Sequence, residues 1–152
     1  MMFRKRLSDL ATRLGSGGIP LLPIRLMIGF GFAAHGWAKL ARGPASFATV
    51  LDAIGVPAPG PMAWLTTLFE LVGGAALALG LWVVPLTLPL IVIMLTAMFG
   101  VHWQNGFSSV RLKAITPAGP QFGPTGYEIN LLYIAGLVSL AMAGVRKNKK
   151  EG

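Results

Sequence analysis

Residues 61–103 read PMAWLTTLFELVGGAALALGLWVVPLTLPLIVIMLTAMFGVHW, and within them only Glu70 carries a formal charge. One helix of about 43 residues would be ~65 Å long at ~1.5 Å per residue, whereas the hydrocarbon core of a bilayer is only ~30 Å thick. The stretch is therefore predicted to fold back on itself, with the turn bracketed by Gly80 and Pro85. The two predicted membrane spans are 62–81 and 85–103.

The composition of the whole chain agrees with a membrane protein, because 54% of its residues are hydrophobic and only 12% are charged. Such a chain does not fit a water-facing surface. The net charge of +8 comes mainly from the two ends and the loops, so anionic lipid headgroups are the expected counter-charge and no nucleic acid is expected. The chain has no cysteine, which excludes disulfides and cysteine-ligated metal or iron–sulfur sites within it.

Apolar stretches at 19–40 and 127–145 add a first and a fourth predicted span. Ahead of them, residues 1–18 repeat apolar side chains at i, i+3, i+4 and i+7 beside several basic ones, a pattern typical of an interfacial helix. The predicted fold class is an all-α membrane protein, a bundle of four transmembrane helices preceded by an interfacial amphipathic helix. After that basic segment the expected parts are a membrane domain at 19–145 and a basic cytoplasmic tail at 146–152.

An even number of spans places both termini on the same side of the membrane. That side carries Arg4, Lys5, Arg6, Arg13, Arg146, Lys147, Lys149 and Lys150. The other side carries Lys39, Arg42, Arg111 and Lys113. The positive-inside rule then predicts that both termini are cytoplasmic and that the long polar loop from Gln104 to Thr125 is outside.

With this topology, the ionisable residues of four predicted helices gather at one level. His35, Lys39, Glu70, His102 and Glu128 all fall in the outer half of the bilayer. A charged carboxylate at mid-helix costs roughly 2.5–3.5 kcal/mol, so it usually faces protein or water and has a partner. Glu70 is therefore predicted to contact His35 or Lys39 across the first and second spans.

A series of short motifs, taken in order, resembles the DoxX family. The motifs are Arg25, His35-Gly36-Trp37-Ala38-Lys39, Phe47 to Gly55 with Pro57 and Pro59, Glu70-Leu71-Val72-Gly73-Gly74, Ala97 with His102, and Gly126-Tyr127-Glu128. The resemblance covers about 23–144 and implies a small four-helix, multi-pass protein of the bacterial inner (plasma) membrane. It also implies redox partners, because members act as the quinone-linked subunit of thiosulfate oxidation or associate with superoxide dismutase and a sulfurtransferase. The family's polar positions correspond to Arg25, His35, Lys39, Glu70, His102 and Glu128.

The first functional hypothesis is a membrane subunit of a redox system, at most one part of an oxidoreductase, that binds a quinone-like molecule. An apolar pocket with a few converging polar groups is the usual form of a small-molecule site. Reduction of a quinone also needs protons, so Glu70 and His35 are the candidate catalytic pair. The candidate ligand-binding residues are Arg25, Lys39, His102 and Glu128, and no metal site is predicted. The sequence shows no electron carrier, so a redox partner protein is expected.

Other functions stay open at this point. The ionic cluster can be purely structural, in a scaffold that assembles other proteins. Acids and histidines inside a membrane also mark transport and proton pathways, although four spans without inverted repeats lack the usual transporter plan. His35 and His102 lie at a similar depth and are conceivable axial ligands of a haem b. Self-association into a homo-oligomer is left open as well.

Overall fold

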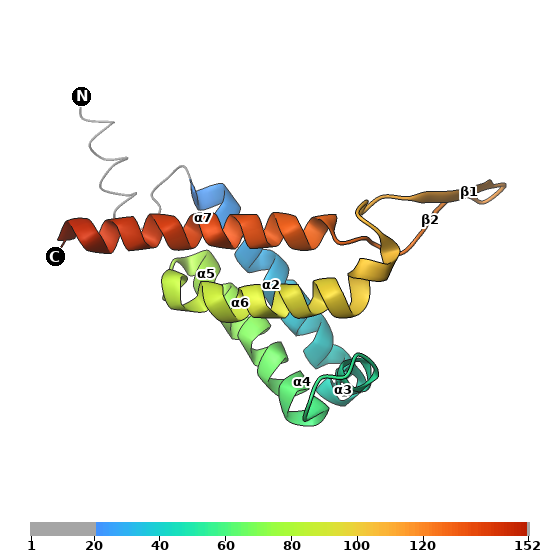
Figure 1. Ribbon diagram of the computed structural model, residues 1–152, viewed down its shortest axis with the longest axis horizontal. Coiled ribbons are helices and arrows are strands. Elements are labelled where there is room, and N and C mark those ends of the chain that lie inside the picture. The colour runs from blue at the N-terminus through green and yellow to red at the C-terminus, as the bar shows by residue number, and fades with distance from the viewer. Residues whose placement is uncertain (1–20, 152) are drawn as a thin grey trace.

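The computed structural model describes residues 21–151, with side chains described as far as residue 145. The predicted interfacial helix at 1–18 lies outside the described residues. The described chain is mostly helical (Figure 1). Its first helix is α2 (Leu22–Arg42), followed by the short helix α3 (Pro44–Ala53). Gly43 joins the two with φ 85°, a conformation that favours glycine.

The second long helix is continuous from Pro59 to Leu79 but is not α-helical throughout. It consists of α4 (Pro59–Leu68), a π-helical turn (Phe69–Gly73) and α5 (Gly74–Leu79). It ends in a Schellman-type turn, in which Leu81 N donates to Ala76 O at 2.8 Å and Gly80 has φ 80°. The turn thus lies where the chain was expected to fold back.

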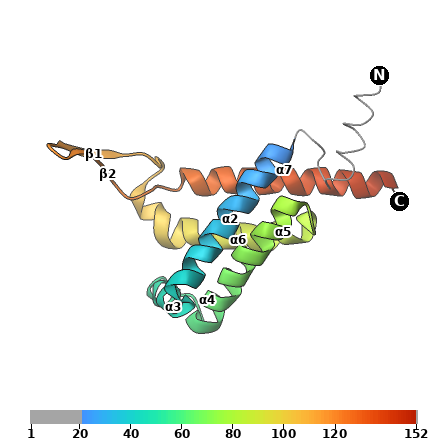
Figure 2. The same ribbon diagram turned by 180° about the vertical axis from the view of Figure 1, so that it is seen from behind.

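The third long helix has the same mixed character. It consists of α6 (Val83–Ala97), a second π-helical turn (Met98–His102) and a 3₁₀ turn (Trp103–Asn105). The last helix is α7 (Glu128–Glu151). In Figures 1 and 2, α6 and α7 run side by side, and the pair formed by α2 and the α4–α5 helix crosses them obliquely.

The segment expected to be an open loop contains a β-hairpin instead. Strands β1 (Leu112–Thr116) and β2 (Gly119–Phe122) pair antiparallel and project beyond the ends of the helices (Figure 1). The all-α fold class is therefore corrected by one small sheet. Almost every hairpin side chain is exposed. A half-buried strand is recognised in a sequence by alternating apolar and polar residues. The two exposed strands lack this alternation.

Glycine allows α2 to approach the second helix closely. Gly29 of α2 faces Gly74 of α5, and a Cβ built on either glycine would lie 2.7 Å from the carbonyl oxygen of the other. This is the small-residue packing that is common between membrane helices. It keeps the second half of α2 near the first π-helical turn, where Glu70 lies.

Three helices of the described part of the chain are long and apolar enough to cross a membrane. They are Pro59–Leu79, Val83–Asn105 and Glu128–Val145. Large apolar side chains such as Phe30, Leu79 and Phe99 are at least 60% exposed on the outside of the molecule, as expected of surfaces in contact with lipid. The protein is therefore an integral membrane protein. The remaining long helix, α2, carries three basic residues. That α2 forms the predicted first span, which would bring the number of spans to four, stays a prediction.

Candidate functional site

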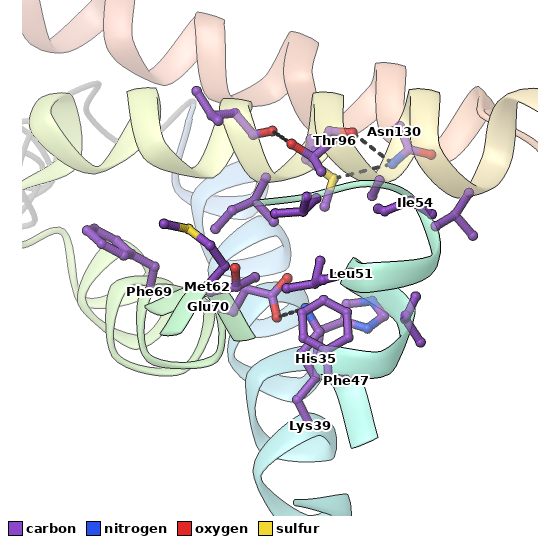
Figure 3. Close-up of a pocket in the computed structure, with 18 of the residues that line it drawn as sticks. His35, Lys39, Phe47, Leu51, Ile54, Met62, Phe69, Glu70, Thr96 and Asn130 are labelled. Atoms are coloured by element: carbon purple, nitrogen blue, oxygen red, sulfur yellow. Dashed lines mark hydrogen bonds and ion pairs between the residues drawn. The ribbon is translucent and has the colours of Figure 1, made fainter. Parts of the chain in front are cut away.

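A cavity of about 920 Å³ lies between the helices and is lined by residues of α2, α3, the α4–α5 helix, α6 and α7 (Figure 3). Its lining is mainly apolar and includes Leu51 of α3, Ile54 directly after that helix, and Met62 and Phe69 of the second helix. α3 lies between the first two predicted spans, and its apolar side closes one wall of the cavity.

One wall carries a direct ion pair between the first two long helices. Nζ of Lys39 lies 2.5 Å from Oε2 of Glu70, and the Glu70 side chain is only 3% exposed. The predicted contact of Glu70 is thus confirmed for Lys39. The Lys39 ammonium also lies 4.0 Å from the centroid of the Phe47 ring, a cation–π geometry by which α3 covers the pair.

Both π-helical turns lie at this cavity and carry ionisable residues. Glu70 belongs to the first turn, and His102 is the last residue of the second. A π-helical turn contains an extra residue, which rotates the following part of the helix by about 100° relative to an uninterrupted α-helix. Such turns are rare and recur at functional sites. They position Glu70 and His102 in a way that regular helical spacing does not predict.

The two histidines line the cavity from different helices. His35 lies one turn before Lys39 on α2, and His102 lies beyond α6. Nδ1 of His102 is 3.0 Å from the carbonyl oxygen of Thr125. Because a carbonyl can only accept, Nδ1 of His102 is the donor of this hydrogen bond.

The cavity brings together four of the six predicted site residues, namely His35, Lys39, Glu70 and His102. Arg25 and Glu128 do not line it. Arg25 is 2% exposed and lies almost three helical turns before His35. Glu128 accepts a hydrogen bond from the backbone N–H of Ser109 at 3.0 Å, so it joins the start of α7 to the preceding loop. The structure thus offers no support for ligand-binding roles of these two residues.

Sequence reasoning overlooked Asn130, which lies in α7 on the cavity wall and is 2% exposed. Its Nδ2 donates to the carbonyl oxygen of Met94 at 3.3 Å, an interaction that joins α7 to α6. The available signal was its position, because a neutral amide within an apolar span also needs partners. Tyr133, one turn further along α7, lines the same cavity and packs edge-on against Phe32.

The fold and this cavity define a helical integral membrane protein with a partly open cavity between its helices. The DoxX family model matches residues 20–103, more than half of the chain. The chain therefore belongs to the DoxX family. The matched region includes both π-helical turns, whereas α7 with Asn130 lies beyond it. No curated protein and no solved structure matches the chain.

Proposed function

We propose that this protein is the membrane subunit of a redox system, binding a quinone-like molecule in the cavity and acting with a partner oxidoreductase. The observation that carries the proposal is a buried ion pair, Glu70–Lys39, on the wall of an otherwise apolar cavity. A pair that served only to neutralise charge would need no adjoining space. Here the two charged groups face a volume that a small molecule can occupy.

The size and lining of the cavity suit such a ligand. Its volume of about 920 Å³ is near the upper end of the ~300–1,000 Å³ that small-molecule sites occupy. That space accommodates an aromatic head group together with the first part of an apolar tail. The polar atoms are few, which is the arrangement that fixes the orientation of an apolar ligand.

Reduction of a quinone to its dihydroxy form, the quinol, takes up two electrons and two protons. The partner oxidoreductase supplies the electrons, and the residues of this chain bind the head group and exchange protons with it. Lys39 donates a hydrogen bond to one oxygen of the head group and keeps Glu70 in place. Glu70 and His35 are the proton-exchanging groups, since both line the cavity within about a helical turn of Lys39 along its wall.

The proposal includes a four-span arrangement in the bacterial inner membrane, with both termini cytoplasmic and the cavity in the outer half. α2 supplies the first span, because its 21 residues extend ~32 Å at ~1.5 Å per residue. Its basic residues are compatible with this depth. Lys39 is paired with Glu70, and Arg42 lies in the last turn, where a long side chain reaches the interface.

The direct test is extraction of the protein purified from its native membrane, followed by chromatography of the extract for quinones. A close-to-stoichiometric quinone is expected, and it should be lost from a variant in which Leu51→Trp fills the cavity. An extract without quinone, from a protein that also fails to bind added quinone, would refute the proposal.

A non-catalytic scaffold is the second candidate, because each charge of the Glu70–Lys39 pair already satisfies the other. Affinity purification from native membranes distinguishes the two functions. A redox subunit should co-purify with a cofactor-bearing oxidoreductase, whereas a scaffold should retain its partners when the cavity is filled.

A further inference from the structure

The cavity is open on the side where α4 faces α6. Among the large apolar side chains that line it, the three most exposed are Leu88 and Val92 of α6, at 69% and 53%, and Leu65 of α4, at 47%. Leu51, on the wall formed by α3, is only 5% exposed. A side chain on a closed wall shows only its inner face, whereas a side chain at a rim also shows its outer face. The three exposed residues therefore mark the rim of an opening between α4 and α6.

The course of the two helices explains the opening. α6 contacts the second helix mainly along α5 and the first π-helical turn, where a Cβ built on Gly73 would lie 3.4 Å from Leu86 Cδ2. Beyond this contact, α4 and α6 diverge in both views of the ribbon (Figures 1 and 2). Figure 3 shows Met62 and Phe69 on one side of the intervening space and Thr96 of α6 on the other. The opening therefore does not depend on the conformation of a single side chain.

The rim of the opening is suited to hydrocarbon. Neither α4 nor α6 contains an ionisable residue, and both belong to helices that are long and apolar enough to cross a membrane. Leu65 lies about 9 Å from the start of α4, and Val92 lies about 14 Å from the start of α6, so both are well inside their helices. The hydroxyl of Thr96 already donates to Val92 O at 3.0 Å. The opening therefore faces the interior of the bilayer.

We infer that a long hydrocarbon tail of the bound molecule leaves the cavity between α4 and α6 and continues into the bilayer. The inference rests on the proposed function and adds the class of ligand, a long-chain quinone of the membrane in place of a short, water-soluble one. The polar head group lies at the Glu70–Lys39 pair, and the cavity holds the head group with the first part of the tail. The remainder of the tail needs a path, and the apolar rim provides it.

This path also determines how the ligand enters. A tail between α4 and α6 exchanges contacts with lipid for contacts with Leu65, Leu88 and Val92, so little free energy is lost when the tail is bound. The head group reaches the ion pair by moving sideways between the helices. The long-chain ligand therefore never passes through water.

The test compares two tryptophan variants of α4. Leu65→Trp places a larger side chain in the opening. Leu68→Trp is the matched control, because Leu68 is 49% exposed on the same helix but does not line the cavity. The probes are a benzoquinone without a tail and the same head group with a tail of several isoprenoid units. Their affinities are measured by titration calorimetry on the full-length protein in detergent, with concentrations expressed relative to the micelle phase.

Leu65→Trp should weaken binding of the tailed probe at least tenfold, because the tail and the indole compete for the same space. The probe without a tail should be weakened about threefold at most. Leu68→Trp should leave both affinities within about twofold of the wild-type values. Weakening of both probes to the same extent by Leu65→Trp, or of neither probe, would overturn the inference.

A photolabelling experiment on the wild-type protein gives an answer even if Leu65→Trp fails to fold. The probe is the tailed quinone with a diazirine in the middle of its tail, and mass spectrometry locates the labelled residues. Label that excess unmodified quinone displaces should lie on α4 and α6. Displaceable label on Val50 of α3 or Ile129 of α7 would place the exit on another side of the cavity and overturn the inference.

A second copy of the chain is the alternative occupant of the opening. In that case Leu65→Trp, but not Leu68→Trp, would convert an oligomer into a smaller species in native mass spectrometry, and the inference would be overturned. Failure of the wild-type protein to bind either probe has a different meaning, because it refutes the proposed function itself.

Discussion

The ammonium of Lys39 is held by a carboxylate and an aromatic ring, Glu70 and Phe47, which come from different helices. Removing one member of a buried ion pair leaves an uncompensated charge, which typically costs about 3–5 kcal/mol of stability. Glu70→Gln and Lys39→Met should each lower the free energy of unfolding by about that amount. The double variant should lose much less than the sum.

Reversible unfolding by sodium dodecyl sulfate in mixed micelles measures these losses. A second double-mutant cycle, of Glu70→Gln with His35→Gln, is the comparison, because the ion pair with Glu70 is formed by Lys39. The coupling energy between Glu70 and His35 should be smaller than that between Glu70 and Lys39. Additive losses for Glu70 and Lys39 would contradict the importance of the contact.

The activity of Glu70→Gln separates a proton-exchanging Glu70 from a structural one. Quinone-linked turnover with the partner oxidoreductase should fall at least tenfold in Glu70→Gln, because glutamine cannot exchange a proton. Glu70→Gln combined with Lys39→Met should recover stability without recovering turnover. Recovery of both would favour the scaffold function.

Among the helices, the approach of α2 to α5 depends on Gly29 and Gly74. A Cβ on Gly74 would lie 2.6 Å from Ala33 N, whereas a Cβ on Gly60 at the start of α4 would meet nothing within 4 Å. Gly74→Ala should therefore destabilise the protein by about 1–3 kcal/mol through overpacking. Thermal unfolding in detergent measures the loss, with Gly60→Ala as the control.

Gly60→Ala should be neutral or slightly stabilising, by up to about 1 kcal/mol, because it restricts the unfolded chain. If the two alanine variants unfolded at the same temperature, the close contact of α2 with α5 would not contribute to stability.

The long apolar stretch and its turn at Gly80 were predictable from the sequence, because the length of a span and the turn-forming glycine are local properties. The two π-helical turns were not, since the residues around Glu70 and His102 carry no local signal for an extra residue per turn. The hairpin escaped prediction for a related reason. Its strands are joined by Pro117-Ala118, which is not a typical hairpin sequence, and their side chains are exposed.

For the candidate site, the sequence predicted that Glu70 contacts His35 or Lys39, because a buried acid requires a partner. The structure shows that the partner is Lys39. The sequence did not distinguish the cavity residues from Arg25 and Glu128, which are also charged residues within predicted spans but do not line the cavity. Depth along a helix follows from the number of residues. The side of the helix that faces a cavity depends on packing, and at Glu70 it also depends on the π-helical turn.

At the scale of the whole molecule, the absence of native cysteine makes the topology testable with single labels. Ser108→Cys lies in the segment proposed to be outside, and Leu81→Cys lies in the turn proposed to be cytoplasmic; both positions are exposed. An impermeant thiol reagent should label Ser108→Cys in intact spheroplasts and Leu81→Cys only after permeabilisation. The reverse pattern would contradict the orientation.

The β-hairpin also provides a position at which a rigid marker for imaging can be inserted. A membrane protein of this size offers little mass outside the detergent micelle for image alignment in electron cryo-microscopy. The two segments that connect the hairpin to the helices are joined to each other by backbone hydrogen bonds such as Tyr127 N to Gly106 O at 3.0 Å, and nothing lies within 4 Å of a Cβ built on Gly119 at the tip of the hairpin. A small rigid domain inserted between Pro117 and Ala118 would therefore serve as a fiducial mark while the cavity stays intact.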